Sequence, residues 1–349
     1  MKRGIRQSNI ELLRIISMFF VLIVHACFQS TGVPNNIDFH NNEIKTVFEI
    51  IFEFIAIPAV NVFILISGYF GIKCKFKSVL NIIYIIFFLR LVLTMCFINP
   101  KEANMETILL LIPGYKDWFT STYMLLLIIS PVLNTYVYNV SNSNKVRYLI
   151  YYLCVGWITG WGLSVWTEYQ DGYGILHFIM LYILGTIIRY YVDSKKINNY
   201  NNLNLLISIG LVLCIVINVS LCIASIVISN GTMSETIIRR LMAYNSPIVI
   251  LMACLILIMF VRISLKSKAI NYIAKSSFSV YIIHQFPLIV PIYNNCFNDL
   301  YIESVDYLYP IYIIAYCIAI YIFCIIIDQF RVYSYKLIQN ICMRRHLFQ

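Results

Sequence analysis

Apolar stretches long enough to cross a lipid bilayer recur along the whole chain and are separated by short polar segments. A transmembrane helix needs about 20 mostly apolar residues. Stretches that meet this condition lie near residues 10–29, 48–70, 79–98, 118–138, 148–165, 175–192, 203–228, 246–263, 277–297 and 307–330. The pattern predicts an all-α polytopic membrane protein of about ten transmembrane helices. The fifth and sixth of these stretches are the weakest.

No polar stretch between these segments is long enough for a separate soluble domain. We therefore expect residues 1–349 to form a single domain in the membrane. The basic start and apolar run of residues 1–29 are also found in signal peptides, but Arg14 interrupts the run and no small-residue cleavage site follows it. This segment is interpreted as the first transmembrane helix.

Composition supports a membrane location. The chain is 60% hydrophobic and 12% charged, whereas soluble domains average about 25% charged residues. Its 11 cysteines include no C-x-x-C pair, and most of them lie inside apolar stretches. Neither a disulfide framework nor a metal site is indicated, and we expect no tightly bound cofactor.

Lys and Arg residues gather in alternate loops, which sets the expected orientation. With the N-terminus inside, the outer side holds only five of them: Lys45, Lys101, Lys116, Arg239 and Arg240. Cytoplasmic loops of membrane proteins are enriched in Lys and Arg. Both termini are therefore expected in the cytoplasm. The net charge of +10 is attributed to this asymmetry, and no nucleic-acid partner is expected.

Ionisable residues inside predicted spans are costly and are candidates for function. They are Glu11, Arg14, His25, Glu49, Glu53, Arg90, His177, His284 and Asp328. Several of them have a structural explanation: positions near helix ends reach the interface, and a structural role is favoured for His177. For Arg90 a structural ion pair explains the position as well as a functional site does.

Arg14 and His25 differ from the others because they share one face of the first helix. They are eleven positions apart, which is about 20° beyond three full turns and a rise of about 16 Å. This geometry suits a long substrate whose anionic part is held by Arg14 and whose reactive end lies near His25. A neutral imidazole can take a proton from a hydroxyl, and Glu49 and Glu53 are candidates to orient the ring. A snorkelling Arg14 and a hydrogen-bonded His25 in the bundle remain the alternative.

The residues around this pair resemble a known motif. Asn9 to Arg14, followed after ten residues by His25, resembles the first-helix signature of the membrane acyltransferase-3 family. That family contains O-acetyltransferases of bacterial surface polysaccharides and peptidoglycan. Four further stretches are similar and fall in the family's order: Val62–Tyr69 with its Ser-Gly-Tyr end, Trp118–Asn134, Phe178–Gly185 and Ser276–His284.

The resemblance implies catalysis by His25 and Arg14 and an acyl-coenzyme A donor, usually acetyl-CoA. The remaining residues expected to bind substrate are Lys73, Lys75, Ser67, Tyr69, Trp118, Tyr123 and His284; the two lysines are a departure, because many family members carry an Arg just after the Ser-Gly motif. The two lysines are expected to contact donor phosphates, although an ordinary basic loop explains them equally well. Trp118 and Tyr123 suit a sugar ring or an interfacial aromatic belt. His284 is expected in the inner part of its helix, in contact with the donor or in helix packing.

The function expected is O-acyl transfer from cytoplasmic acyl-CoA to a hydroxyl of a surface polysaccharide or lipid-linked sugar. The protein is expected in the bacterial cytoplasmic membrane, and a homodimer is left open. The alternatives are a transporter or flippase of glycan precursors, which also places Arg and His in the membrane, and a glycan polymerase. No internal repeat of the transporter type is apparent, and the outer loops are short and mostly acidic.

Overall fold

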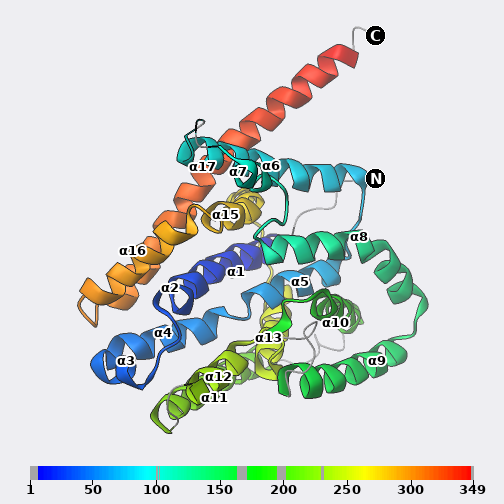
Figure 1. The fold of residues 1–349 in the computed structure, drawn as a ribbon. Helices are drawn as coiled ribbons and strands as arrows, with labels where there is room; N and C mark the ends of the chain where they lie inside the picture. The colour runs from blue at the N-terminus through cyan, green and yellow to red at the C-terminus, as the bar shows by residue number, and fades with distance from the viewer. Residues whose placement is uncertain are drawn as a thin grey trace.

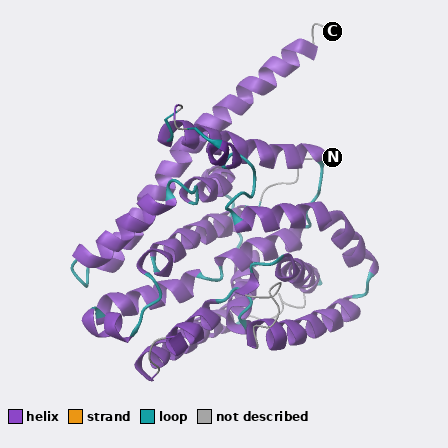
Figure 2. Cartoon of the chain, viewed as in Figure 1, coloured by secondary structure: helices purple, strands orange, loops and turns teal. Residues whose placement is uncertain are grey.

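The computed structural model describes residues 7–99, 101, 103–162, 171–194, 202–228 and 232–346. Within these ranges the chain forms helices joined by loops, without a strand (Figure 2). Eight helical segments of this described part are long and apolar enough to cross a membrane. The prediction of an all-α polytopic membrane protein is thus confirmed.

The eight spans include several helices that are interrupted inside one apolar run. They are α1 (Ser8–Ala26) with α2 (Phe28–Thr31), α4 (Glu43–Ala56) with α5 (Ala59–Phe70), α6 (Phe76–Phe97), α8 (Trp118–Asn139), α10 (Ile175–Asp193), α11 (Leu203–Ile228), α12 (Thr232–Met242) with α13 (Pro247–Val261), and α17 (Tyr309–His346). Pro58 lies directly before α5 and explains the break between α4 and α5, because proline removes a backbone donor. Short helices α3 (Asn36–Asn41), α7 (Met105–Leu109) and α14 (Lys268–Ile273) lie between spans.

The other two expected spans have a different form. The fifth is α9 (Asn142–Val155), continued by a π-helical segment at Gly156–Gly162, and the end of the predicted stretch lies outside the described residues. The ninth is split into α15 (Ser277–His284) and α16 (Val290–Glu303). Pro287 lies in the connection, where its missing backbone donor disfavours one continuous helix over 277–297.

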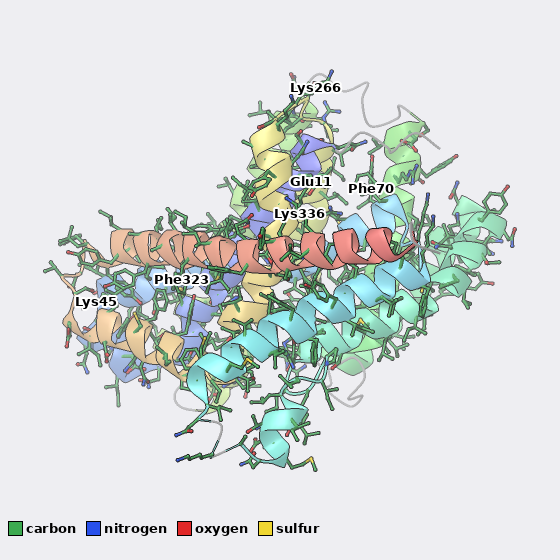
Figure 3. All side chains as sticks on the ribbon, turned by 90° about the horizontal axis from the view of Figure 1, so that it is seen from above. Glu11, Lys45, Phe70, Lys266, Phe323 and Lys336 are labelled. Atoms are coloured by element: carbon green, nitrogen blue, oxygen red, sulfur yellow. The ribbon has the colours of Figure 1, made fainter. Side chains whose placement is uncertain are left out.

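Helix α1 runs through the middle of the bundle and contacts α4, α5, α13, α15 and α17 (Figure 1). Its buried face includes Leu13 and Leu22, both fully buried. The outer surface is apolar, as lipid contact requires: Phe323 of α17, for example, is 61% exposed and projects from the bundle (Figure 3).

Close contact between α5 and α10 depends on two glycines. A Cβ atom at Gly68 would overlap the carbonyl of Tyr182, and one at Gly185 would overlap the carbonyl of Leu65. Small residues let transmembrane helices approach this closely. Two of the motifs seen in the sequence therefore act in helix packing: the Ser-Gly-Tyr end of α5 and the Tyr-x-x-Gly of α10.

A buried ion pair ties α6 to the segment before α8. Arg90 is 1% exposed, and its Nη2 lies 3.1 Å from Asp117 Oδ2. Its Nη1 donates to the carbonyls of Leu110, Ile112 and Tyr115. Arg90 thus has the structural ion pair that its position in the helix suggested.

Candidate functional site

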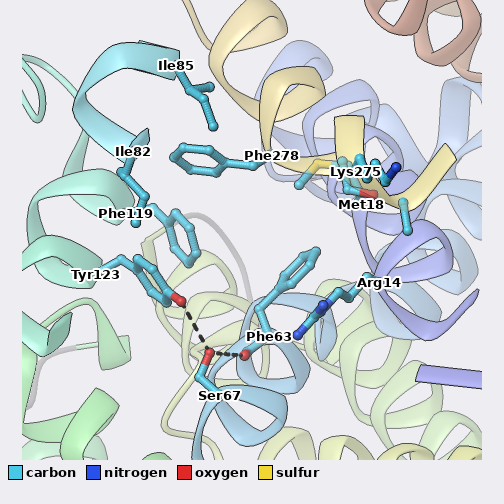
Figure 4. Close-up of a pocket in the computed structure, with 12 residues that line it drawn as sticks. Arg14, Met18, Phe63, Ser67, Ile82, Ile85, Phe119, Tyr123, Lys275 and Phe278 are labelled. Atoms are coloured by element: carbon cyan, nitrogen blue, oxygen red, sulfur yellow. Dashed lines mark hydrogen bonds between the residues drawn. The ribbon is translucent and has the colours of Figure 1, made fainter. Parts of the chain in front are cut away.

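A cavity of about 330 Å³ lies between α1, α5, α6, α8 and α15. Figure 4 shows Arg14 and Lys275 on one side of it, and Phe119 and Tyr123 on the other. Arg14 is paired with Glu11 at 3.1 Å, and its side chain remains 36% exposed. Two cations therefore line the same cavity, and most of its remaining wall is apolar.

Ser67 and Tyr123, both predicted to bind substrate, lie together in this wall. Ser67 Oγ donates to the carbonyl of Phe63 at 2.9 Å and lies 3.5 Å from Tyr123 Oη (Figure 4). The two hydroxyls come from α5 and α8, and the structure brings them together beside Arg14. Ser67 and Tyr123 thus place two hydroxyl groups in the wall of the cavity that Arg14 and Lys275 also line.

A second, much smaller cavity of about 20 Å³ continues from the first toward His25. Met18, Phe63 and Phe119 line both cavities. His25 and Trp118 line only the smaller one, together with Tyr244 and Tyr281. The linings of the two cavities thus overlap at three residues between Arg14 and His25.

His25 contacts a second histidine. Its Nδ1 lies 2.9 Å from Nε2 of His284 and 2.8 Å from Nε2 of Gln285. Nδ1 of His284 lies 2.7 Å from the carbonyl oxygen of Val280, which can only accept, so this nitrogen carries a hydrogen. A neutral His284 then offers a lone pair from Nε2 to His25.

This contact favours one tautomer of His25. His284 is 1% exposed, and a lone imidazolium buried there costs several kcal/mol. If both rings are neutral and His25 Nδ1–H donates to His284, the Gln285 amide must be rotated so that its oxygen takes the place of the Nε2 that lies 2.8 Å from Nδ1. Nε2 of His25 is then the nitrogen that is ready to accept a proton.

His284 and His25 lie at the same depth, which corrects the expectation that His284 sits nearer the inner end. The reason is that α15 is short and runs beside α1, so its last residue reaches the last turn of α1. Arg14 and Lys275 line the same cavity near the beginnings of these two helices. The two histidines contact each other in the last turns. In the sequence, only their position next to the Ser276–His284 motif distinguishes Lys275 and Gln285.

The two glutamates on α4 make their hydrogen bonds elsewhere. Glu49 accepts from Tyr309 Oη at 2.6 Å and from Thr31 Oγ1 at 3.1 Å. Glu53 is 1% exposed, and its Oε2 has no hydrogen-bond partner among the described residues. Within the described residues, the side chains at hydrogen-bonding distance from the His25 ring are those of His284 and Gln285, and neither glutamate is among them.

Lys73, Lys75 and Tyr69 lie outside the lining between Arg14 and His25. The two lysines are exposed in the loop between α5 and α6. Tyr69 lines a different cavity on the other side of α5. The cation that the fold places with Arg14 is Lys275 of the segment before α15.

Aromatic residues enclose the His25 end of the lining. Trp118 packs edge-on against Tyr173 with ring centroids 4.4 Å apart, and its ring lies 5.7 Å from that of Tyr244. Tyr281 is held by donation of its Oη to Asp117 Oδ1 at 2.7 Å. The Arg90–Asp117 pair therefore also positions one wall of the site.

His177 and Asp328 have structural partners. His177 Nε2 lies 3.1 Å from Asn61 Oδ1, and Asp328 accepts from Ser276 Oγ and pairs with Arg331. In the described part of the chain, no three His, Cys, Asp or Glu side chains are placed to hold a metal ion.

Comparison with known families agrees with these observations. A family model described as an acyltransferase domain (Acyl_transf_3) matches residues 7–329, nearly the whole chain. The searches of curated proteins and of solved structures gave no match. The match confirms the resemblance predicted from the motifs. The chain therefore belongs to the acyltransferase-3 family and is a multi-pass membrane acyltransferase.

Proposed function

We propose that the protein is an O-acyltransferase that moves an acyl group, acetyl in the first instance, from acyl-CoA to a hydroxyl of a surface glycan. The acceptor is a polysaccharide or a lipid-linked sugar outside the cytoplasm, and the protein resides in the bacterial cytoplasmic membrane. The observation that carries the proposal is the pair of cavities with overlapping linings, one at Arg14 and Lys275 and the other at His25.

In this proposal the donor lies along these two linings. Its phosphates bind the two cations, and charge-assisted hydrogen bonds from Arg suit phosphate well. Its uncharged arm passes Met18, Phe63 and Phe119, whose side chains line both cavities. The thioester then lies beside His25, while the acceptor hydroxyl is enclosed by Trp118 and its aromatic neighbours.

His25 acts as the general base. Its Nε2 takes the hydroxyl proton as the acceptor oxygen attacks the thioester carbonyl and the new C–O bond forms. The C–S bond breaks when the tetrahedral intermediate collapses, and His25 returns the proton to the leaving thiolate. His284 accepts the Nδ1–H hydrogen bond throughout and stabilises the ring while it is charged.

The test is transfer of label from acetyl-CoA to a glycan extract by the purified protein in liposomes. His25→Ala is expected to abolish transfer, whereas His40→Ala, which removes an exposed histidine of α3, is expected to leave it unchanged. Propionyl-CoA and butyryl-CoA, run in parallel, define the acyl group.

Two results would contradict the proposal. One is full transfer by folded His25→Ala protein. The other is no transfer by folded wild-type protein with any of the three donors and several glycan extracts.

A further inference from the structure

A separate polar cavity of about 380 Å³ lies where α5, α8, α9 and α10 end or begin. It is on the other side of α5 from the donor cavity: Gly68 and Tyr69 line it, whereas Phe63 and Ser67 line the donor cavity. All four of these helix ends belong to the side that the basic loops predict to be cytoplasmic. The cavity is therefore expected near the level of the inner lipid headgroups.

Lys145 is the unusual residue of this cavity. It stands in the first turn of α9 and is only 7% exposed. Its ammonium group has three hydrogen-bond donors, yet within the described residues it makes one hydrogen bond, to Asn142 Oδ1 at 3.2 Å, and no ion pair. A buried cation at the positive end of a helix is unfavourable unless an anion joins it.

The other charges of the cavity leave this cation uncompensated. Arg189 Nε lies 3.3 Å from Asp193 Oδ2, so these two side chains neutralise each other. Arg189 Nη1 also donates to the carbonyl of Tyr69, at 3.3 Å. Lys145 thus gives the lining a formal charge of +1, and the cavity suits an anionic group.

A second, apolar chamber indicates that the anionic group belongs to a molecule with an apolar part. Lys145 also lines a cavity of about 130 Å³ between α8, α9 and α10, whose other walls include Leu149, Ile179 and Ile183. The Lys145 side chain therefore stands between a polar chamber and an apolar one. Helix α9 lies at the edge of the bundle (Figure 1), where lipid has access to it.

We propose that the two chambers bind one anionic glycerophospholipid, with its phosphate at Lys145 and Arg189 and part of an acyl chain in the apolar chamber. Basic pockets between transmembrane helices on the cytoplasmic side suit anionic headgroups. An inorganic phosphate or the phosphates of coenzyme A share the charge, but they make no use of the apolar chamber.

The experiment titrates the protein in neutral detergent with short-chain phosphatidylglycerol and follows thermal unfolding. Phosphatidylcholine of the same chain length, inorganic phosphate and coenzyme A are titrated separately. Phosphatidylglycerol is expected to raise the unfolding temperature, and Lys145→Gln to weaken its binding roughly ten- to hundredfold, as expected for loss of a charged hydrogen bond.

Matched variants separate this site from general charge effects. Arg147→Gln makes the same charge change on an exposed position of the same helix and is expected to bind as wild type does. Lys145→Arg keeps the charge and is expected to retain binding. Leu149→Trp fills the apolar chamber at constant charge and is expected to weaken binding of the lipid.

Equal stabilisation by phosphatidylcholine would overturn the proposal, as would equal losses in Lys145→Gln and Arg147→Gln. Stabilisation by phosphate or coenzyme A that depends on Lys145 and matches that of the lipid would show an anion site without a lipid chain. If Lys145→Gln fails to fold, unchanged lipid binding by Leu149→Trp overturns the proposal instead. None of these outcomes depends on acyl transfer.

Discussion

Replacing His284 by alanine tests the proposed catalytic arrangement most directly. The side chain makes two polar contacts: its Nδ1 lies 2.7 Å from the carbonyl of Val280, and its Nε2 lies 2.9 Å from Nδ1 of His25. It lines neither the donor cavity nor its extension to His25. The substitution therefore removes the partner of the base without changing the donor path.

The expected loss follows from the hydrogen bond itself. When His25 takes the acceptor proton, the Nδ1–H of a charged ring donates to His284. A hydrogen bond to a charged group contributes about 1.5–3 kcal/mol, which corresponds to a fall in kcat of about 10- to 150-fold. The KM for acyl-CoA is expected to change little, since no donor contact is lost. His284→Gln offers an amide oxygen as acceptor and is expected to lose less.

The assay is label transfer under saturating donor and acceptor, with protein whose folding has been checked by thermal unfolding. If His284→Ala kept its kcat within about threefold of wild type, the hydrogen bond would be irrelevant to the rate. If instead KM rose at unchanged kcat, His284 would be a donor contact and not a positioning residue.

Three further predictions concern the surrounding structure. Asp117→Asn leaves Arg90 buried without its counter-charge and should lower the free energy of unfolding by about 3–5 kcal/mol, measured as a lower unfolding temperature. Adding Arg90→Met to this variant should restore much of the lost stability. Gly68→Ala should sharply reduce the yield of folded protein because its Cβ meets backbone, whereas at Gly210→Ala the neighbour is a flexible Leu side chain and the yield should hold. Arg14→Gln should raise the KM for acyl-CoA about tenfold or more at nearly constant kcat, and a fall in kcat alone would contradict a donor-binding role.

The apolar pattern predicted the spans that consist of one continuous helix. Helices α6, α8, α10 and α11 lie within a few residues of the predicted stretches, because an uninterrupted apolar run forms a helix wherever it enters the bilayer. Hydropathy predicted one helix over 277–297, whereas the structure has two, α15 and α16. Hydropathy measures only how apolar the residues are, so it does not include the effect of Pro287 on backbone hydrogen bonding.

The candidate site was predictable to the extent that it lies on one helix. The shared face of Arg14 and His25 follows from helical geometry alone. The contact between His25 and His284 joins residues 259 positions apart, so it depends on how α1 and α15 pack. Glu49 was chosen as a partner of His25 by depth in the membrane, and depth does not specify which neighbouring helix a side chain faces.

The packing of α1 and α15 also explains why this pair of histidines suits proton transfer. On each of these two segments a cation precedes a histidine: Arg14 stands eleven residues before His25 on α1, a rise of about 16 Å, and Lys275, just before α15, stands nine residues before His284. Each histidine stands in the last turn of its helix, because α1 ends at Ala26 and Pro287 follows α15 closely. A helix C-terminus carries a partial negative charge that stabilises a cation by about 0.3–1 kcal/mol. The C-terminal ends of α1 and α15 both lie at the contact between His25 and His284. Their partial negative charges therefore offset part of the cost of charging an imidazole inside the bundle. A single long helix through residues 277–297 would place His284 mid-helix and remove one of the two contributions.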